Sequence, residues 1–131
     1  DLDIIIKMTL EIRNFVAVGV ISNLINFLIF YFVYRLLGNL IFATIIGYCM
    51  GLLFSYLGGF LWVFRKTNQK LINSLTLFII VYTLGGVGMS IIALICFENL
   101  YFDHRVSWLI GAIFAFFNNF FGQKYIAFRT N

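Results

Sequence analysis

The chain has 131 residues, a formal net charge of +4, and a composition that is 63% hydrophobic and only 11% charged. A soluble domain of this length needs more polar side chains to cover its surface, so the composition excludes that class. Nucleic-acid binding is excluded as well, because apolar runs occupy nearly the whole chain and leave no soluble domain to present the basic residues. We interpret the chain as an all-α integral membrane protein.

Four uncharged apolar runs predict four transmembrane helices. A helix needs about 20 apolar residues to cross roughly 30 Å of hydrocarbon, and it satisfies its own backbone hydrogen bonds there. The first run is too long for a cleaved signal peptide, and three more follow it. We expect one membrane domain, residues 1–131, with helices over about 13–37, 40–65, 74–99 and 105–128.

The distribution of lysine and arginine predicts the orientation. Cytoplasmic segments of membrane proteins carry an excess of these residues. Here seven lie on one side of the predicted helices and two on the other, so we expect both termini and the 65–74 loop in the cytoplasm. The seven are Lys7, Arg13, Arg65, Lys66, Lys70, Lys124 and Arg129, and the two are Arg35 and Arg105.

The second and fourth predicted helices end in a similar way. Residues 60–67 read FLWVFRKT and residues 124–131 read KYIAFRTN. A shift of 64 positions aligns Gly47 with Gly111 and Phe64 with Phe128. We interpret the chain as two tandem helical hairpins, about 13–67 and 75–131, each with an even number of crossings. Such parallel repeats are related by an axis along the membrane normal.

Small residues recur at every fourth position on two helices. Gly47, Gly51 and Ser55 lie on the second helix, and Gly111 and Ala115 on the fourth. This spacing places them on one face and allows a neighbouring backbone to approach closely. We predict packing surfaces there.

Polar side chains interrupt the first and fourth apolar runs. Such amides can hydrogen-bond between helices, which is a structural role. Alternatively they form a polar, cation-bearing site open to the inner leaflet, because ionisable groups within a membrane need a partner. The residues alone leave both readings open. They are Ser22, Asn23 and Asn26 on the first helix, and Asn118, Asn119, Gln123 and Lys124 on the fourth.

No residue pattern indicates catalysis. The loop with Glu98, Asp103 and His104 reads as a solvated turn, and no nucleophile–base set, carboxylate pair or glycine-rich phosphate loop accompanies it. Cys49 and Cys96 lie inside apolar runs without metal-ligand spacing, which predicts buried inert thiols. We therefore expect neither an enzyme nor a cofactor or metal.

Three segments carry a resemblance to the GtrA-like family, over about residues 13–130. They are NFVAVGVISNLINFLIFY (14–31), WVFR (62–65) and NNFFGQKYIAFR (118–129). The family usually has Asn-x-x-x-Val-Phe at the second helix exit. Here Gly59 replaces the Asn, while Val63 and Phe64 are retained. On the fourth helix the corresponding amide is Gln123, followed by Lys124.

The resemblance implies flipping of a polyprenyl-phosphate-linked sugar across the cell membrane for cell-surface glycosylation. The partners would be that lipid, membrane-bound glycosyltransferases, surrounding lipids and further copies of the chain. A lipid phosphate would pair with basic residues at the inner interface, and amides would bind the sugar. With no energy-coupling motif, we expect facilitated flipping. The candidate site residues are Lys124, Gln123, Asn119, Asn118, Asn23, Asn26, Arg65 and Arg129.

Two alternatives remain open. The chain could be a non-transporting anchor that docks or forms part of a polyprenyl-phosphate glycosyltransferase, since the sequence begins without Met and a catalytic domain can precede it. A small ion channel or drug exporter is less consistent, because a proton-coupled exporter needs a carboxylate in mid-membrane. Glu11 and Glu98 lie near helix ends instead.

Overall fold

The computed structural model describes residues 1–130, and all regular structure in that range is helical. Four helical stretches are long and apolar enough to cross a membrane, as the sequence predicted. Two of them end in a π-helical turn. The elements are α1 (Leu2–Leu37), α2 (Leu40–Gly58), η1 (Gly59–Val63), α3 (Leu71–Glu98), α4 (His104–Gly122) and η2 (Gln123–Ala127).

The first helix is longer than predicted, because it begins at Leu2 rather than near residue 13. Hydropathy marks the part of a helix that can lie in hydrocarbon, and the charges before Phe15 ended the apolar run there. Those charges are compatible with a helix. The negative charge of Asp3 in the first turn is favourable, because the N-terminal end of the helix dipole is positive. The helix stops at Gly38, whose left-handed backbone (φ 68°) lets its N–H donate to the Tyr34 carbonyl at 2.8 Å.

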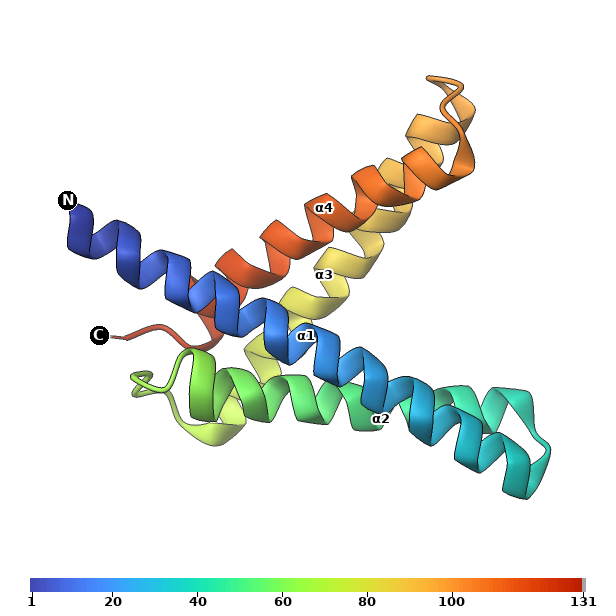
Figure 1. Ribbon diagram of the computed structural model, residues 1–131, viewed down its shortest axis with the longest axis horizontal. Helices are drawn as coiled ribbons and strands as arrows, with labels where there is room; N and C mark the ends of the chain where they lie inside the picture. The colour runs from blue at the N-terminus through green and yellow to red at the C-terminus, as the bar shows by residue number, and fades with distance from the viewer. Residues whose placement is uncertain (131) are drawn as a thin grey trace. The chain divides into compact units, whose positions relative to one another are not determined.

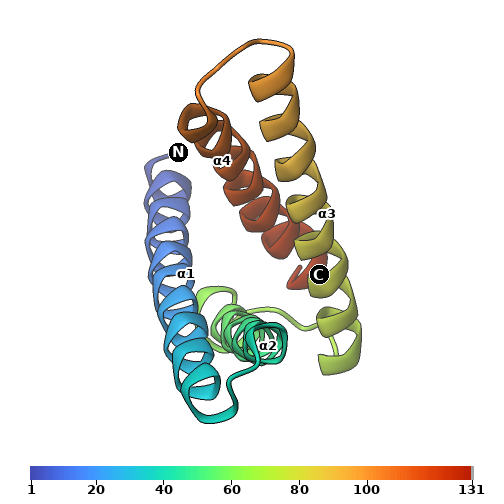
Figure 2. The same ribbon diagram turned by 90° about the vertical axis from the view of Figure 1, so that its right-hand side faces the viewer.

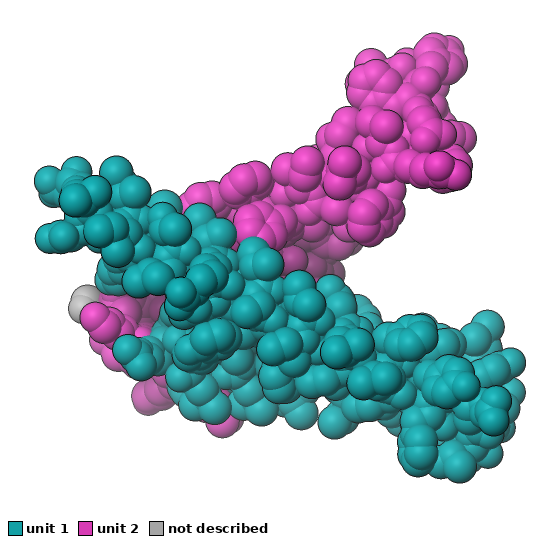
Figure 3. All heavy atoms as spheres, in the orientation of Figure 1, with its two compact units in different colours: residues 1–65 teal, residues 66–131 magenta. Residues whose placement is uncertain are grey.

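The chain forms two compact units, Asp1–Arg65 and Lys66–Asn131 (Figure 3). The first unit is the hairpin of α1 and α2, and the second is the hairpin of α3 and α4, as Figures 1 and 2 both show. In the first unit the side-chain oxygen of Asn39 accepts the Phe42 N–H at 3.0 Å, which caps α2. Both hairpins therefore bring helices that are adjacent in sequence into direct packing.

Glycines set the closest approach between the helices of each hairpin. A Cβ at Gly47 would lie 2.7 Å from the backbone oxygen of Asn26, and one at Gly51 would lie 2.9 Å from the Ser22 oxygen. In the second unit, a Cβ at Gly111 would lie 2.7 Å from the Met89 oxygen. These distances leave no room for a side chain, which confirms the predicted packing role of the three glycines.

The two units repeat the same internal contacts at positions 63 or 64 residues apart. Gly58 lies against Val18 in the first unit, and Gly122 lies against Val81 in the second. In both units the contact joins the first helix of the hairpin to the second. The arrangement of the two hairpins relative to a membrane axis stays a prediction.

The π-helical turns are also equivalent. The N–H of Phe64 donates to the Gly59 carbonyl, and the N–H of Phe128 to the Gln123 carbonyl, both at 2.8 Å. Each bond spans five residues instead of the four of an α-helix. Phe64 and Phe128, both buried, leave helical geometry with nearly the same φ, −117° and −116°. The repeated ending noted in the sequence is therefore the exit of a π-helical turn.

One expectation about the cysteines is wrong. Cys96 is buried, but Cys49 is exposed on α2. An apolar run in a membrane helix has a lipid-facing side as well as a packed side, so hydropathy alone does not indicate burial.

Candidate functional site

The turn η2 presents Lys124 and buries Gln123. Gln123 is only 2% exposed, whereas Lys124 is half-buried. The ammonium nitrogen of Lys124 lies 5.5 Å from the ring centroid of Tyr125 and 5.9 Å from that of Phe120. At these distances both rings attract the cation. The positive charge is therefore held beside aromatic surface at the end of the helix.

The backbone on which Lys124 stands is fixed from two sides. Phe128 is fully buried and packs against Phe78 of α3, with 6.1 Å between the ring centroids. The Thr67 hydroxyl donates to the Arg129 carbonyl at 2.9 Å, which ties the chain end to the segment before α3. Arg129 itself is exposed. These two contacts hold the helix exit that follows Lys124.

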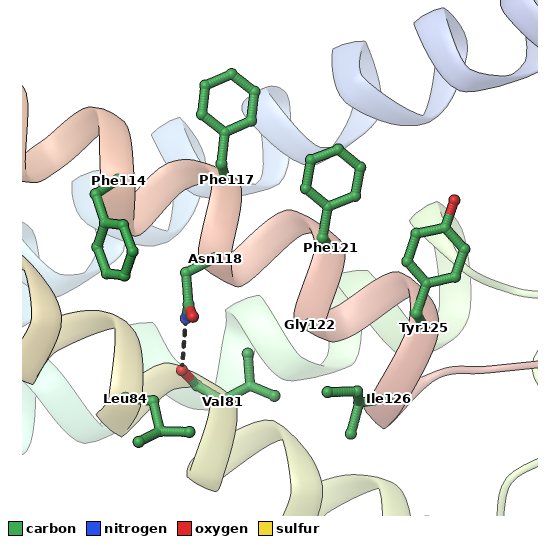
Figure 4. Close-up of a pocket in the computed structure, with 9 residues that line it drawn as sticks. All are labelled: Val81, Leu84, Phe114, Phe117, Asn118, Phe121, Gly122, Tyr125 and Ile126. Atoms are coloured by element: carbon green, nitrogen blue, oxygen red, sulfur yellow. Dashed lines mark hydrogen bonds between the residues drawn. The ribbon is translucent and has the colours of Figure 1, made fainter.

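Two neighbouring amides of α4 lie against α3. The side-chain nitrogen of Asn118 donates to the Val81 carbonyl at 3.0 Å (Figure 4). It also donates to the side-chain oxygen of Asn119 at 3.3 Å. Gly85 makes room for the pair, because a Cβ there would lie 2.5 Å from the Asn119 oxygen. Asn118 therefore joins the helices, and its own carbonyl oxygen takes part in neither bond.

A hollow of about 420 Å³ lies beside Asn118, between α3 and the α4–η2 helix (Figure 4). Asn118 and Tyr125 are the polar side chains among the residues that line it, and the others are apolar. A partly open, mostly apolar hollow with one amide in its wall suits an apolar ligand that carries a polar group.

The first unit does not bring its two amides together. Asn26 is half-buried against Gly47 and Gly51 of α2, but Asn23 is exposed. The sequence placed them on one face because they are three residues apart. At 3.6 residues per turn they differ by about 60° around the helix. That difference lets one face the partner helix while the other faces outward. Arg65 is exposed directly after the η1 exit.

The candidate residues thus fall into two sets. Asn118, Asn119, Gln123, Lys124 and Arg129 lie on the second half of α4, on η2 and just beyond it, all within the second unit. Asn23, Asn26 and Arg65 belong to the first unit.

Sequence reasoning missed two features of this region. The π-helical turns have no residue-type signature that separates them from α-helix. The stack of Phe117, Phe121 and Tyr125 was readable, because aromatic residues four apart share a helix face. In the part of the chain that the structure describes, no group of three or more His, Cys, Asp or Glu side chains could hold a metal ion.

Comparison with known proteins gives one match. The model of the family described as GtrA/DPMS, transmembrane domain, matches residues 14–128. No curated protein and no solved structure matches the chain significantly. The matched range includes all four membrane-spanning stretches except the first twelve residues of α1.

Proposed function

Since the chain belongs to the GtrA/DPMS transmembrane-domain family, we propose that it flips a polyprenyl-phosphate-linked sugar across the cell membrane. The family places this multi-pass membrane protein in the handling of polyprenyl-phosphate sugars. Translocation is our proposal within that setting. The lysine and arginine distribution supports loading from the cytoplasmic leaflet, with both termini on that side.

Lys124 is the observation that carries the proposal. A lipid phosphate is an anion at the membrane interface, and an ammonium group forms strong charge-assisted hydrogen bonds with it. Lys124 stands near the end of a membrane-spanning helix, half-buried, on backbone fixed by the Phe78–Phe128 contact. The ammonium group is therefore held on ordered backbone at the place where a lipid phosphate would lie.

The neighbouring polar groups suit the rest of the ligand. Arg65 and Arg129, both exposed, would attract anionic headgroups to the cytoplasmic face, at about 1 kcal/mol per cation near the surface. Asn118 lines the hollow, and its side-chain carbonyl oxygen would accept a hydrogen bond from a sugar hydroxyl. The hydrocarbon tail of the lipid would remain in contact with the apolar surface of the helices and with the surrounding lipid. Consumption of the carrier on the outer side would drive net flow, because no energy-coupling motif is present in the sequence.

A second candidate is a non-transporting anchor for a polyprenyl-phosphate glycosyltransferase. The Asn118–Val81 hydrogen bond and the glycine contacts favour it, because they describe a tightly packed hairpin that needs no ligand. This candidate predicts that substitutions at exposed polar positions leave function unchanged, provided that the helices still pack.

Reconstitution separates the two. The purified chain is inserted into proteoliposomes that contain a polyprenyl-phosphate sugar labelled on the sugar, and the fraction accessible to a membrane-impermeant reagent is followed with time. We expect faster exchange between leaflets than in protein-free vesicles and no acceleration for a labelled phosphatidylcholine. Correctly inserted, folded protein that leaves the sugar lipid at the protein-free rate contradicts transport and favours the anchor.

A further inference from the structure

Three aromatic side chains form a continuous stripe along α4 and η2. We call Phe117, Phe121 and Tyr125 the aromatic stripe. The rings of Phe117 and Phe121 are 6.2 Å apart and inclined by 13°, and those of Phe121 and Tyr125 are 6.1 Å apart and inclined by 5°. All three are between 39% and 57% exposed. Figure 4 shows them projecting from the same side of the helix.

Packing inside the protein does not explain the stripe. A lipid-facing position accepts any apolar residue, because lipid tails are as apolar as leucine. The positions 64 residues earlier in the first unit hold Leu53, Leu57 and Leu61, which are similarly exposed. The two hairpins thus pack in the same way, but only the second has aromatic rings at these three positions.

The interfacial aromatic belt explains Tyr125 only. Tyrosine and tryptophan favour the headgroup level of a bilayer. At 1.5 Å rise per residue, Phe121 and Phe117 lie about 6 and 12 Å further along the helix, toward the hydrocarbon. Phenylalanine has no polar group that would need the interface. The interfacial belt therefore does not account for the two inner rings.

The stripe is continuous with the proposed phosphate site. The ammonium nitrogen of Lys124 lies 5.5 Å from the Tyr125 ring centroid, at one end of the stripe. Phe117, Phe121 and Tyr125 are also among the residues that line the hollow of about 420 Å³ beside Asn118. A lipid whose phosphate pairs with Lys124 would thus have its first hydrocarbon units directly over the stripe.

We propose that the aromatic stripe binds the isoprenoid chain of the carrier lipid and distinguishes it from saturated acyl chains. The inference rests on the proposed function, because it assumes a phosphate at Lys124. Isoprene units are planar at each double bond and carry a methyl branch, so they lie flat on parallel ring faces with many close contacts. A saturated chain has no such planar units, so it should gain less from the ring faces.

The test compares binding of two lipid phosphates to the full chain in zwitterionic nanodiscs. The probes are a long-chain polyprenyl monophosphate and a saturated phosphatidic acid, and native mass spectrometry gives both affinities and the oligomeric state. The variant Phe117→Leu/Phe121→Leu/Tyr125→Leu restores the leucines of the first unit. The matched control is Phe27→Leu/Tyr31→Leu, which removes a stacked, exposed aromatic pair of α1, 6.4 Å apart.

We expect wild type to prefer the polyprenyl phosphate, and the triple variant to lose most of that preference, roughly tenfold, since each aromatic contact contributes a factor of about 2 to 12 in affinity. The control should keep it. Lys124→Gln should weaken the binding of both lipids and leave the ratio of their two affinities unchanged.

Several results overturn the inference. If the triple variant keeps the preference, or if wild type has none, the stripe does not distinguish the isoprenoid chain from an acyl chain. In that case, an equal loss of affinity for both lipids in Lys124→Gln still supports the proposed function. A changed oligomeric state in the triple variant would identify the stripe as a contact between copies. Absence of binding by both lipid phosphates overturns the proposed function and the inference together.

Discussion

Phe128, the first residue after η2, packs its fully buried ring against Phe78 of α3, with 6.1 Å between centroids. This contact joins the end of the second hairpin to the start of its other helix. The π-helical hydrogen bond from the Phe128 N–H to the Gln123 carbonyl then sets the backbone of η2. The position of Lys124 follows from these two interactions, so the support and the proposed phosphate site are open to separate tests.

Truncation of Phe128 should destabilise the protein. Phe128→Ala leaves a cavity beside Phe78, and buried Phe→Ala changes cost about 3–5 kcal/mol. We expect a lower midpoint of thermal unfolding in detergent and a lower yield of folded protein. Phe32→Ala is the control, because Phe32 is 64% exposed and surface changes usually stay within about 0.5 kcal/mol. Equal stability of both variants would show that the ring contact does not hold the exit in place.

Two glycines of the second hairpin should respond differently to the same substitution. A Cβ at Gly111 would lie 2.7 Å from the Met89 backbone oxygen, whereas one at Gly86 would meet nothing within 4 Å. Gly111→Ala should therefore destabilise by about 1–3 kcal/mol through overpacking. Gly86→Ala should be neutral or slightly stabilising, because alanine favours helix. Thermal unfolding of both variants checks this. Normal stability of Gly111→Ala with complete loss of flipping would instead place Gly111 on the transport path.

Asn118 should matter for both packing and ligand choice. Asn118→Ala removes the hydrogen bond to the Val81 carbonyl, and such bonds in membranes average about 0.6 kcal/mol. Because Asn118 also lines the hollow, we expect the variant to lose part of its preference for sugar-linked over sugar-free polyprenyl phosphate. Relative affinities of the two lipids measure it. A small loss of stability with an unchanged preference would leave Asn118 a purely structural residue.

The packing of each hairpin could be predicted from the sequence because it depends on residue size at helical spacing. Gly47, Gly51 and Gly111 have no side chain, so only their faces allow a close backbone approach, and the four-residue period identifies those faces. The repeated Phe64 and Phe128 likewise marked two equivalent helix exits.

The detail of the site could not be predicted because it depends on hydrogen-bond register. Whether the Phe128 N–H reaches the fourth or the fifth preceding carbonyl depends on tertiary packing around the exit, to which the contact of Phe128 with Phe78 belongs. Asn23 and Asn26 show the same limit, since a rotation of about 60° between them decides which one faces α2. Residue spacing constrains a face but not the exact orientation within it.

Both termini should lie in the cytoplasm. In a background with Cys49→Ser and Cys96→Ser, Thr130→Cys tests the C-terminal side and Asn99→Cys the opposite side. Asn99 follows α3, and both residues are exposed. We expect a membrane-impermeant thiol reagent to label only Asn99→Cys in intact cells, and both after permeabilisation. Labelling of Thr130→Cys from outside intact cells would contradict the positive-inside prediction.

Lys124 should bind the lipid phosphate, and its charge should matter more than its length. Lys124→Gln removes a charge-assisted contact of about 1.5–3 kcal/mol, which corresponds to a loss of about tenfold or more in affinity. Lys124→Arg keeps the charge and the hydrogen-bond donors, so it should retain much of the activity. If Lys124 only extends its ammonium group to the lipid headgroups, both variants should have near-normal activity, since an amide at the interface costs little. Flipping rates in proteoliposomes over a range of sugar-lipid concentrations separate these outcomes, with thermal unfolding confirming that each variant is folded.

Lys66→Gln is the matched control, because Lys66 is an exposed cation of the loop before α3 and its substitution should affect the rate only slightly. A normal rate for Lys124→Gln at every concentration would identify Lys124 as an anchor and remove the central support for the proposed site.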